Sequence, residues 1–160
     1  MLETEGIQKD QSIKYENLVS LRKKLFQEEI QPELIKLAEY MKNKNVQRKG
    51  PMISTTYDVE EVDGKQLLDM EFLFPVNQNI DLPEDYRFKP IFHLVHAIYK
   101  RHIGAAETLE ETYNELHAYM KENQLQQITS GYNININEKE AAAGKTPIID
   151  VYIGVNPSIL

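Results

Sequence analysis

The feature that most constrains the fold is a similarity between the two halves of this 160-residue chain. Two pairs of segments share residues: "AEYMKNKN" (38–45) with "HAYMKENQ" (117–124), and "FPVNQ" (74–78) with "IGVNP" (153–157). Both pairs have the same offset of 79 positions, as Tyr40 and Tyr119 illustrate (119 − 40). Two anchors at one offset, with no gap between them, predict an internal duplication. The repeats are expected at approximately 12–78 and 91–157.

The predicted helices carry the same apolar stripe in both repeats. At i, i+4, i+7 and i+11 stand Ile30, Leu34, Leu37 and Met41 in the first repeat, and Leu109, Tyr113, Leu116 and Met120 in the second. This spacing predicts an amphipathic helix that buries one face. Pro32 is expected in the first turn of the first helix, since proline is tolerated there. Thr108 and Glu111 predict a capping box at the start of the second helix.

Each repeat is expected to contain a strand, a helix and two further strands. The predicted strand segments are "SIKYENLVSL" (12–21), "PMISTTYDVEEV" (51–62), "LLDMEFLFPV" (67–76), "IFHLVHAIY" (91–99), "SGYNININ" (130–137) and "IIDVYIGV" (148–155). Asp63-Gly64 between two alternating runs predicts a tight hairpin. The segment "QNIDLPEDYRFKP" (78–90) is expected to be a linker because it holds two prolines. "EKEAAAGKTP" (138–147) is expected to be a loop, either a mobile flap or a long hairpin connection.

These elements define an α+β fold class. We expect one domain over residues 1–160, in which tandem duplicated strand-helix-strand-strand units form one mostly antiparallel sheet. The two main helices are expected on one face of that sheet, which leaves the opposite face for another purpose.

Composition limits the classes of function. A hydrophobic content of 41% and a charged content of 27% are typical of a globular protein. No apolar run approaches the roughly 18 residues of a membrane-spanning helix, so no membrane partner is expected. The net charge of −7 argues against a nucleic-acid partner, because phosphate binding needs a cationic surface. The absence of cysteine and of a signal peptide favours a cytoplasmic location.

Motifs for metal or cofactor chemistry are lacking. His93 and His96 stand three positions apart in a predicted strand, so their side chains would point to opposite faces and would not share one ion. Gly144 and Lys145 lack the upstream glycine of a phosphate-binding loop. We therefore expect no metal site and no cofactor.

The period-two pattern of the strands separates a core face from a second face. In 67–76 the core face is apolar throughout, with Leu68, Met70, Phe72, Phe74 and Val76. Glu71 lies on the second face, and the 79-residue offset places Asp150 at the equivalent position. Other candidates for this face are Tyr57, Tyr99, Asn133, Asn135 and Tyr152. The pattern leaves two interpretations open: a solvated sheet face, or a cleft between the repeats where carboxylates and tyrosines bind an organic cation.

A family resemblance appears in "AIYKRHIGAAETLEETYNELHAYMKENQL" followed by "DVYIGVN". The residues that fit its helix motif are Tyr99, Gly104, Leu109, Tyr113, Leu116, Glu122 and Asn123. They resemble the GyrI-like small-molecule-binding domain, a family that includes the effector-binding domains of AraC-type and MerR-type multidrug regulators. The resemblance covers both repeats and implies a tandem strand-helix-strand-strand fold. No helix-turn-helix precedes the domain, so the chain resembles the stand-alone members.

The resemblance also implies a role for the two acidic positions. In the family, a buried acidic residue in the cleft is implied to hold cationic, lipophilic ligands. That role falls to Asp150 by position and to Glu71 by internal equivalence. The last strand has Asp150 where the family usually has Glu and Gly154 where Pro is common, whereas the first repeat keeps Glu71 and Pro75.

Three functions are therefore considered. The first is a cytoplasmic ligand-binding protein that holds an amphipathic, cationic small molecule between its repeats; its predicted binding residues are Glu71, Asp150, Tyr152, Tyr57, Tyr99, Asn133 and Asn135. The second is an interaction module, such as an inhibitor, immunity or accessory protein, whose acidic surface binds a basic protein partner. The third is a hydrolase of strained electrophilic small molecules, with a carboxylate as general base and a tyrosine as acid. We expect a binding protein rather than an enzyme.

Overall fold

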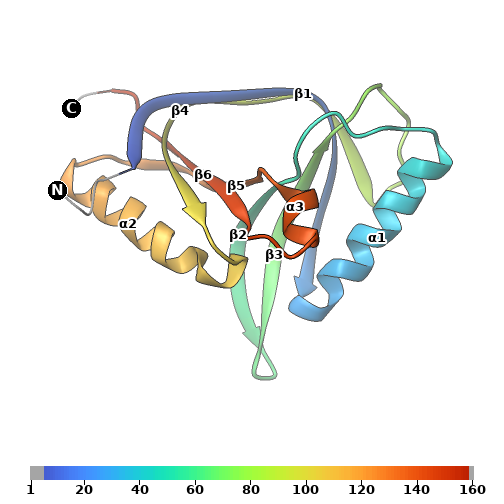
Figure 1. Ribbon diagram of the computed structural model, residues 1–160, viewed down its shortest axis with the longest axis horizontal. Coiled ribbons are helices and arrows are strands. Elements are labelled where there is room, and N and C mark those ends of the chain that lie inside the picture. Colours follow the sequence, from blue (N-terminus) through green and yellow to red (C-terminus); the bar gives the residue numbers. More distant parts are fainter. Residues whose placement is uncertain (1–5, 159–160) are drawn as a thin grey trace. The chain divides into compact units, whose positions relative to one another are not determined.

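The computed structural model describes residues 6–158 and is dominated by strands (Figure 1). In chain order its elements are β1 (Ile7–Phe26), α1 (Gln27–Asn43), β2 (Ile53–Val62), β3 (Lys65–Pro75), β4 (Tyr86–Ile103), a short 3-10 helix (Ala106–Thr108), α2 (Leu109–Glu122), β5 (Gln127–Asn135), α3 (Glu138–Ala142) and β6 (Ile148–Val155). The chain forms two compact units. We call Tyr15–Phe92 the central unit, and the described residues on either side of it, 6–14 and 93–158, the flanking unit.

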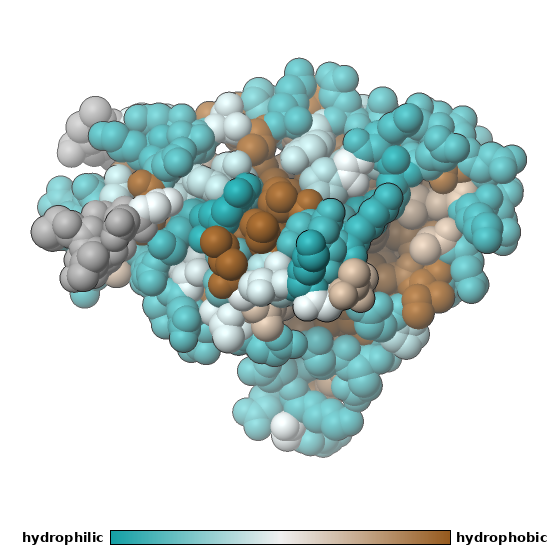
Figure 2. Space-filling view, viewed as in Figure 1, coloured by the Kyte–Doolittle hydropathy of each residue, from teal (hydrophilic) through white to brown (hydrophobic). Residues whose placement is uncertain are grey.

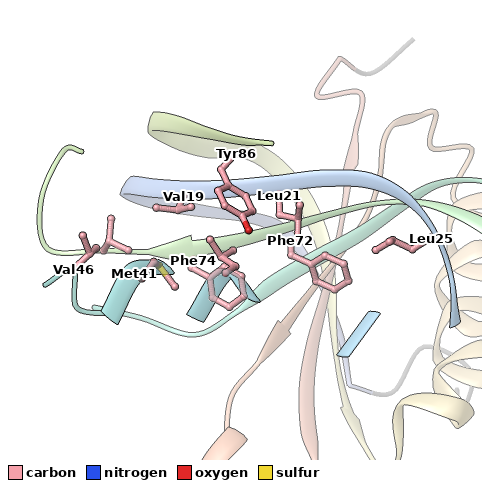
Figure 3. Packing of buried hydrophobic residues seen from close by; sticks show 10 residues of the cluster. Val19, Leu21, Leu25, Met41, Val46, Phe72, Phe74 and Tyr86 are labelled. Atoms are coloured by element: carbon pink, nitrogen blue, oxygen red, sulfur yellow. The ribbon is translucent and has the colours of Figure 1, made fainter. Parts of the chain in front are cut away.

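The central unit contains an antiparallel arrangement in which β3 pairs with both β1 and β2. Alternate residues of β3 pack with β1 and α1 in one apolar core, as the period-two pattern predicted. Figure 3 shows this core, which includes Val19, Leu21, Leu25, Met41, Val46, Phe72, Phe74 and Tyr86. Leu37 on the helix stripe is fully buried there. Burial of these side chains holds α1 to the strands, because removal of apolar area from water is the main stabilising contribution.

The flanking unit has its main elements in a similar order, β4, α2, β5 and β6, and it also contains the start of β1, the short 3-10 helix and α3. Here β6 pairs antiparallel with both β4 and β5. Its core combines the stripe of α2 with one face of β6, through Ile98, Leu116, Met120, Ile149, Val151, Ile153 and Val155. Antiparallel strands covered by a helix confirm the α+β class for each unit.

The strand registers of the two units are equivalent. Glu71 lies opposite one residue of β1 and one of β2, and Asp150 lies opposite one residue of β4 and one of β5; these partners are Arg22, Thr55, Arg101 and Ile134. Each partner in the flanking unit stands 79 positions after its counterpart, as Asp150 does after Glu71 (150 − 71). Equal registers support the internal duplication, which stays a prediction. The single domain and the single continuous sheet also stay predictions.

The helix starts differ from the sequence predictions. The first helix begins at Gln27, so Pro32 lies in its second turn instead of its first. Its start is stabilised by Glu29, whose carboxylate accepts a hydrogen bond of 2.9 Å from the Phe26 N–H. The second helix starts after Thr108 as predicted, but the capping box is wrong. The Thr108 hydroxyl donates to the Ala105 carbonyl at 2.8 Å and makes no bond to the helix.

Two predicted irregular segments contain regular structure. The linker 78–90 is shorter than predicted, because β4 begins at Tyr86. This tyrosine is 6% exposed and packs in the central core, which fixes the chain around it. The predicted loop 138–147 contains helix α3, in keeping with the high helix propensity of its Glu, Lys and Ala residues.

The predicted hairpin turn is confirmed at Asp63-Gly64. Both residues have positive φ, 51° and 79°, as a two-residue turn of this class requires. The tip of the β2–β3 hairpin is hydrophilic (Figure 2). Within residues 6–158, none of the helices has the length and apolar character needed to cross a membrane.

Candidate functional site

Glu71 is a buried carboxylate with three hydrogen-bond donors. It lies on β3 between core residues that point the opposite way, and only 2% of its surface is exposed. Lys89 Nζ lies 2.6 Å from Oε2, and the Ser20 hydroxyl donates to the same oxygen at 2.5 Å. The Tyr57 hydroxyl donates to Oε1. A buried carboxylate with a cation and two hydroxyl donors is a fully compensated charge.

These donors also fix the ionisation state of Glu71. Burial raises the pKa of this carboxyl, because desolvation disfavours the charged form. The hydrogen bonds from Lys89, Ser20 and Tyr57 act in the opposite direction, and the charge of Lys89 adds to them. The net effect lowers the pKa of Glu71 below its ordinary value, so the group is a carboxylate at neutral pH.

Each donor reaches Glu71 for a local structural reason. Ser20 lies opposite Leu73 in the β1–β3 register, on the same side of the strands as Glu71. Tyr57 sits at a register shift between Thr56 and Asp58, where a bulge places one extra residue in β2. Lys89 lies near the start of β4, in the part of the chain that the sequence pattern predicted to be a linker.

A pocket of about 530 Å³ opens beside Glu71. Its lining comes from the central unit alone: Ser20, Arg22, Lys23, Lys24, Tyr57, Asp69, Glu71, Glu84, Asp85, Arg87 and Lys89. The volume lies within the range of roughly 300 to 1,000 Å³ that is usual for small-molecule sites. The aromatic wall is Tyr57, and the Arg22 guanidinium stacks 4.0 Å from its ring centroid while it pairs with Asp69 at 3.1 Å. The pocket is thus strongly polar.

Asp150 is the corresponding buried carboxylate of the flanking unit, with 7% of its surface exposed. Arg101 binds it with two nitrogens, Nε to Oδ1 at 2.8 Å and Nη2 to Oδ2 at 3.1 Å. The Tyr99 hydroxyl donates to Oδ1 at 2.9 Å, and the Tyr99 ring lies 4.9 Å from that of Tyr152. Burial and the bond to Asp150 raise the pKa of Tyr99, and the bond to Asp150 raises the pKa of Arg101.

The structure brings together two groups of the predicted site residues. Tyr57 contacts Glu71 in the central unit, and Tyr99 and Tyr152 accompany Asp150 in the flanking unit. Both carboxylates are buried, which is inconsistent with the interpretation that they lie on a solvated sheet face.

The two predicted asparagines do not join them. Asn133 and Asn135 lie opposite Val151 and Ile149 of β6, which are core residues that pack with α2. Residues directly opposite each other share a face, so both asparagines are on the helix side, away from Asp150. Asn133 accepts a 2.6 Å hydrogen bond from the hydroxyl of the half-buried Tyr113. This corrects the expectation that they share a face with the carboxylates.

Three partners of the carboxylates were not predicted: Ser20, Lys89 and Arg101. The sequence contains a signal for Ser20 and Arg101. The 79-residue offset relates Ser20 to Tyr99 and Arg22 to Arg101, and these residues lie on the strands that pair with the strands of Glu71 and Asp150. No comparable signal points to Lys89, which lies outside both predicted repeats.

Residues 3–155 match the family model of the GyrI-like small molecule binding domain. The C-terminal domain of EcmrR is similar in structure, with 16% identity, a TM-score of 0.68, and coverage of 95% of this chain and 99% of that one. The chain spans 59% of the EcmrR chain in its complex with DNA. No curated protein sequence matches the chain.

Two further structures show the same fold at low identity. An uncharacterized conserved protein from Listeria innocua has 13% identity and a TM-score of 0.62, with coverage of 92% of this chain and 93% of that one. SAV2435 bound to tetraphenylphosphonium has 13% identity and a TM-score of 0.51, with coverage of 94% and 93%. At these identities the likeness concerns the fold.

Proposed function

Because the chain belongs to the family of GyrI-like small-molecule-binding domains, we propose that it binds an organic cation in the pocket beside Glu71. The observation that carries this proposal is the ionised, buried carboxylate at the pocket wall. A negative charge removed from water attracts a cation more strongly than a surface carboxylate does, because solvent screens it less.

The ligand would contact Glu71 through its charged end and Tyr57 through its apolar part. The Tyr57 hydroxyl binds Glu71, so the tyrosine ring lies next to the carboxylate in the pocket, and the stacked Arg22 shows that this ring attracts a positive charge. The tetraphenylphosphonium held by SAV2435 supports cations as the ligand class, since that protein shares the fold. We propose an amphipathic cation of small size, bound in the cytoplasm.

The Asp150 group is the second place where such a ligand is predicted, with Tyr99 and Tyr152 as its aromatic walls. Its carboxylate is bound at both oxygens by Arg101, so a ligand there has to compete with a two-point ion pair. We therefore assign the main role to Glu71. We further propose that the two units arose by duplication and that their carboxylates have since diverged in role.

Ring-opening hydrolysis is less well supported than binding. A general base that works near neutral pH needs a carboxyl whose pKa is raised toward 7. The pKa of Glu71 is lowered instead, although its contact with the Tyr57 hydroxyl resembles an acid–base pair. Binding needs only the ionised carboxylate.

A thermal-shift screen of organic cations tests the proposed function, with octylammonium and tetraphenylphosphonium as the first probes. Ligand at a hundred times its dissociation constant should add about 2.7 kcal/mol to the free energy of unfolding, which shifts the melting temperature by several degrees. Glu71→Gln should lose the shift. Glu61→Gln, on the exposed β2–β3 hairpin, is the matched control and should keep it. Absence of any shift in the folded wild-type protein would count against cation binding and favour a protein partner.

A further inference from the structure

The three donors to Glu71 differ in how easily they can leave. Ser20 is 2% exposed, and its hydroxyl is fixed on β1. Tyr57 is held by the bulge of β2 and by the stacked Arg22. Lys89 is the charged donor, and its side chain is 39% exposed. A lysine side chain is a flexible stem of four carbons that ends in a single point charge, so the ammonium group can move into water without any change in the backbone.

Lys89 also occupies the position that a cationic ligand needs. Its Nζ lies 2.6 Å from Oε2, at the pocket side of a carboxylate whose side chain is only 3% exposed. An incoming cation at Glu71 therefore has to replace the lysine ammonium. Ser20 and Tyr57 keep one hydrogen bond on each oxygen during that exchange, so the carboxylate retains its orientation without Lys89.

The equivalent carboxylate in the flanking unit, Asp150, has a partner that is held more firmly. Arg101 holds Asp150 through two nitrogens, each on a different oxygen. The planar guanidinium fork has to break both bonds before either oxygen is open, whereas the lysine breaks one. Of these two buried carboxylates, Glu71 has the partner that exchanges more easily.

The vacated position suits a particular kind of cation. A ligand nitrogen at the position of the Lys89 ammonium would lie within hydrogen-bond distance of Glu71 Oε2, and this oxygen accepts a hydrogen bond from any nitrogen that carries hydrogen. A quaternary cation donates no hydrogen bond and needs several aromatic walls instead, but among the described residues Tyr57 is the single aromatic side chain in the lining of this pocket, and Arg22 stacks on its ring. The rest of the lining consists of charged side chains and Ser20.

We propose that Lys89 is a resident counter-ion which the alkylammonium group of a ligand displaces, and that this exchange selects protonated primary amines over quaternary cations. The inference rests on the proposed function, because it concerns the same pocket. It identifies Lys89 as a specificity-determining residue.

The test is a calorimetric titration with two cations that share one chain, octylammonium and octyltrimethylammonium. In the wild-type protein, octylammonium should bind at least about tenfold more tightly, as expected for a hydrogen bond to a charged acceptor. Lys89→Met should raise the affinity for octylammonium about tenfold or more, since the competitor is gone. Lys65→Met removes a lysine of a surface ion pair outside the pocket, the pair with Glu28, and should leave both affinities unchanged.

A second variant guards against a general effect of net charge. Lys89→Arg keeps the charge and can hold Glu71 with two nitrogens, so it should weaken octylammonium binding relative to wild type. The thermal unfolding of each variant verifies that it is folded. If the wild type binds octylammonium and neither Lys89 variant changes its affinity, the inference is overturned while the proposed function stands. If neither cation binds the wild type or Lys89→Met, the proposed function fails, and the inference with it.

Discussion

Replacement of Arg101 by methionine should measurably destabilise the protein. The substitution keeps most of the aliphatic stem but removes both nitrogens that bind Asp150, at 2.8 and 3.1 Å. The carboxylate, whose side chain is 10% exposed, is then left with the Tyr99 hydroxyl as its remaining donor among the bonds described above. A buried charge that loses its partner retains its desolvation penalty without compensation.

The magnitude follows from how open the pair is. Loss of one partner of a fully buried pair costs about 3–5 kcal/mol. The Arg101 side chain is 46% exposed, so water screens part of the attraction and can replace part of the hydrogen bonding. We therefore expect a decrease in the free energy of unfolding of about 2 kcal/mol, between the surface and the buried limits.

Urea unfolding of a double-mutant cycle measures this quantity, with Asp150→Asn as the second substitution. In the double variant the charge is absent, so the loss of Arg101 should cost much less than it does in the wild-type background. A coupling energy of about 1 kcal/mol or more is predicted, whereas independent sites add within about 0.5 kcal/mol. Additive effects within that margin would refute the argument that the ion pair holds Asp150.

Three further predictions concern packing and pH. Gly131→Ala should lower the free energy of unfolding by about 1–3 kcal/mol in urea titrations, because its methyl group would collide with the Tyr113 ring and hydroxyl; a free energy of unfolding equal to that of the wild type would contradict this contact. Leu116→Ala should cost about 2–5 kcal/mol by the same assay, since Leu116 is 0% exposed in the flanking core; a cost below 1 kcal/mol would contradict that packing. The Glu71 carboxyl has a lower pKa folded than unfolded, so its ionised form contributes stability above the unfolded value, and this contribution is lost as the pH falls through the folded value. The stability difference between wild type and Glu71→Gln should therefore be constant near neutrality and shrink below about pH 4.5; a difference that grows toward acid would contradict the sign.

Much of the fold could be predicted because its signals are local. The strand 148–155 has the bounds expected from its alternation, and the Asp63-Gly64 hairpin follows from residues that tolerate positive φ. All residues of the apolar stripes of both helices reach the cores, as predicted. The start of α1 was harder to predict, because Glu29 favours an earlier start than Pro32 indicates.

The sites were predicted less completely, because they depend on register. The face on which Glu71 and Asp150 lie follows from the alternation of side chains along a single strand, and this alternation can be read directly from the sequence. The face of Asn133 depends on how β5 aligns with β6, and a long connection that includes α3 leaves that alignment open. Lys89 reaches Glu71 only because the chain becomes a strand at Tyr86, which buried tertiary packing determines.

Isothermal titration calorimetry of octylammonium with wild type and Glu71→Gln at neutral pH tests the central claim most directly. The account predicts that the wild-type protein binds one cation and that Glu71→Gln binds it at least about tenfold more weakly, as loss of a charged acceptor requires. Glu61→Gln should bind like wild type. Equal affinity in Glu71→Gln and wild type would contradict the assignment of the site to the central unit.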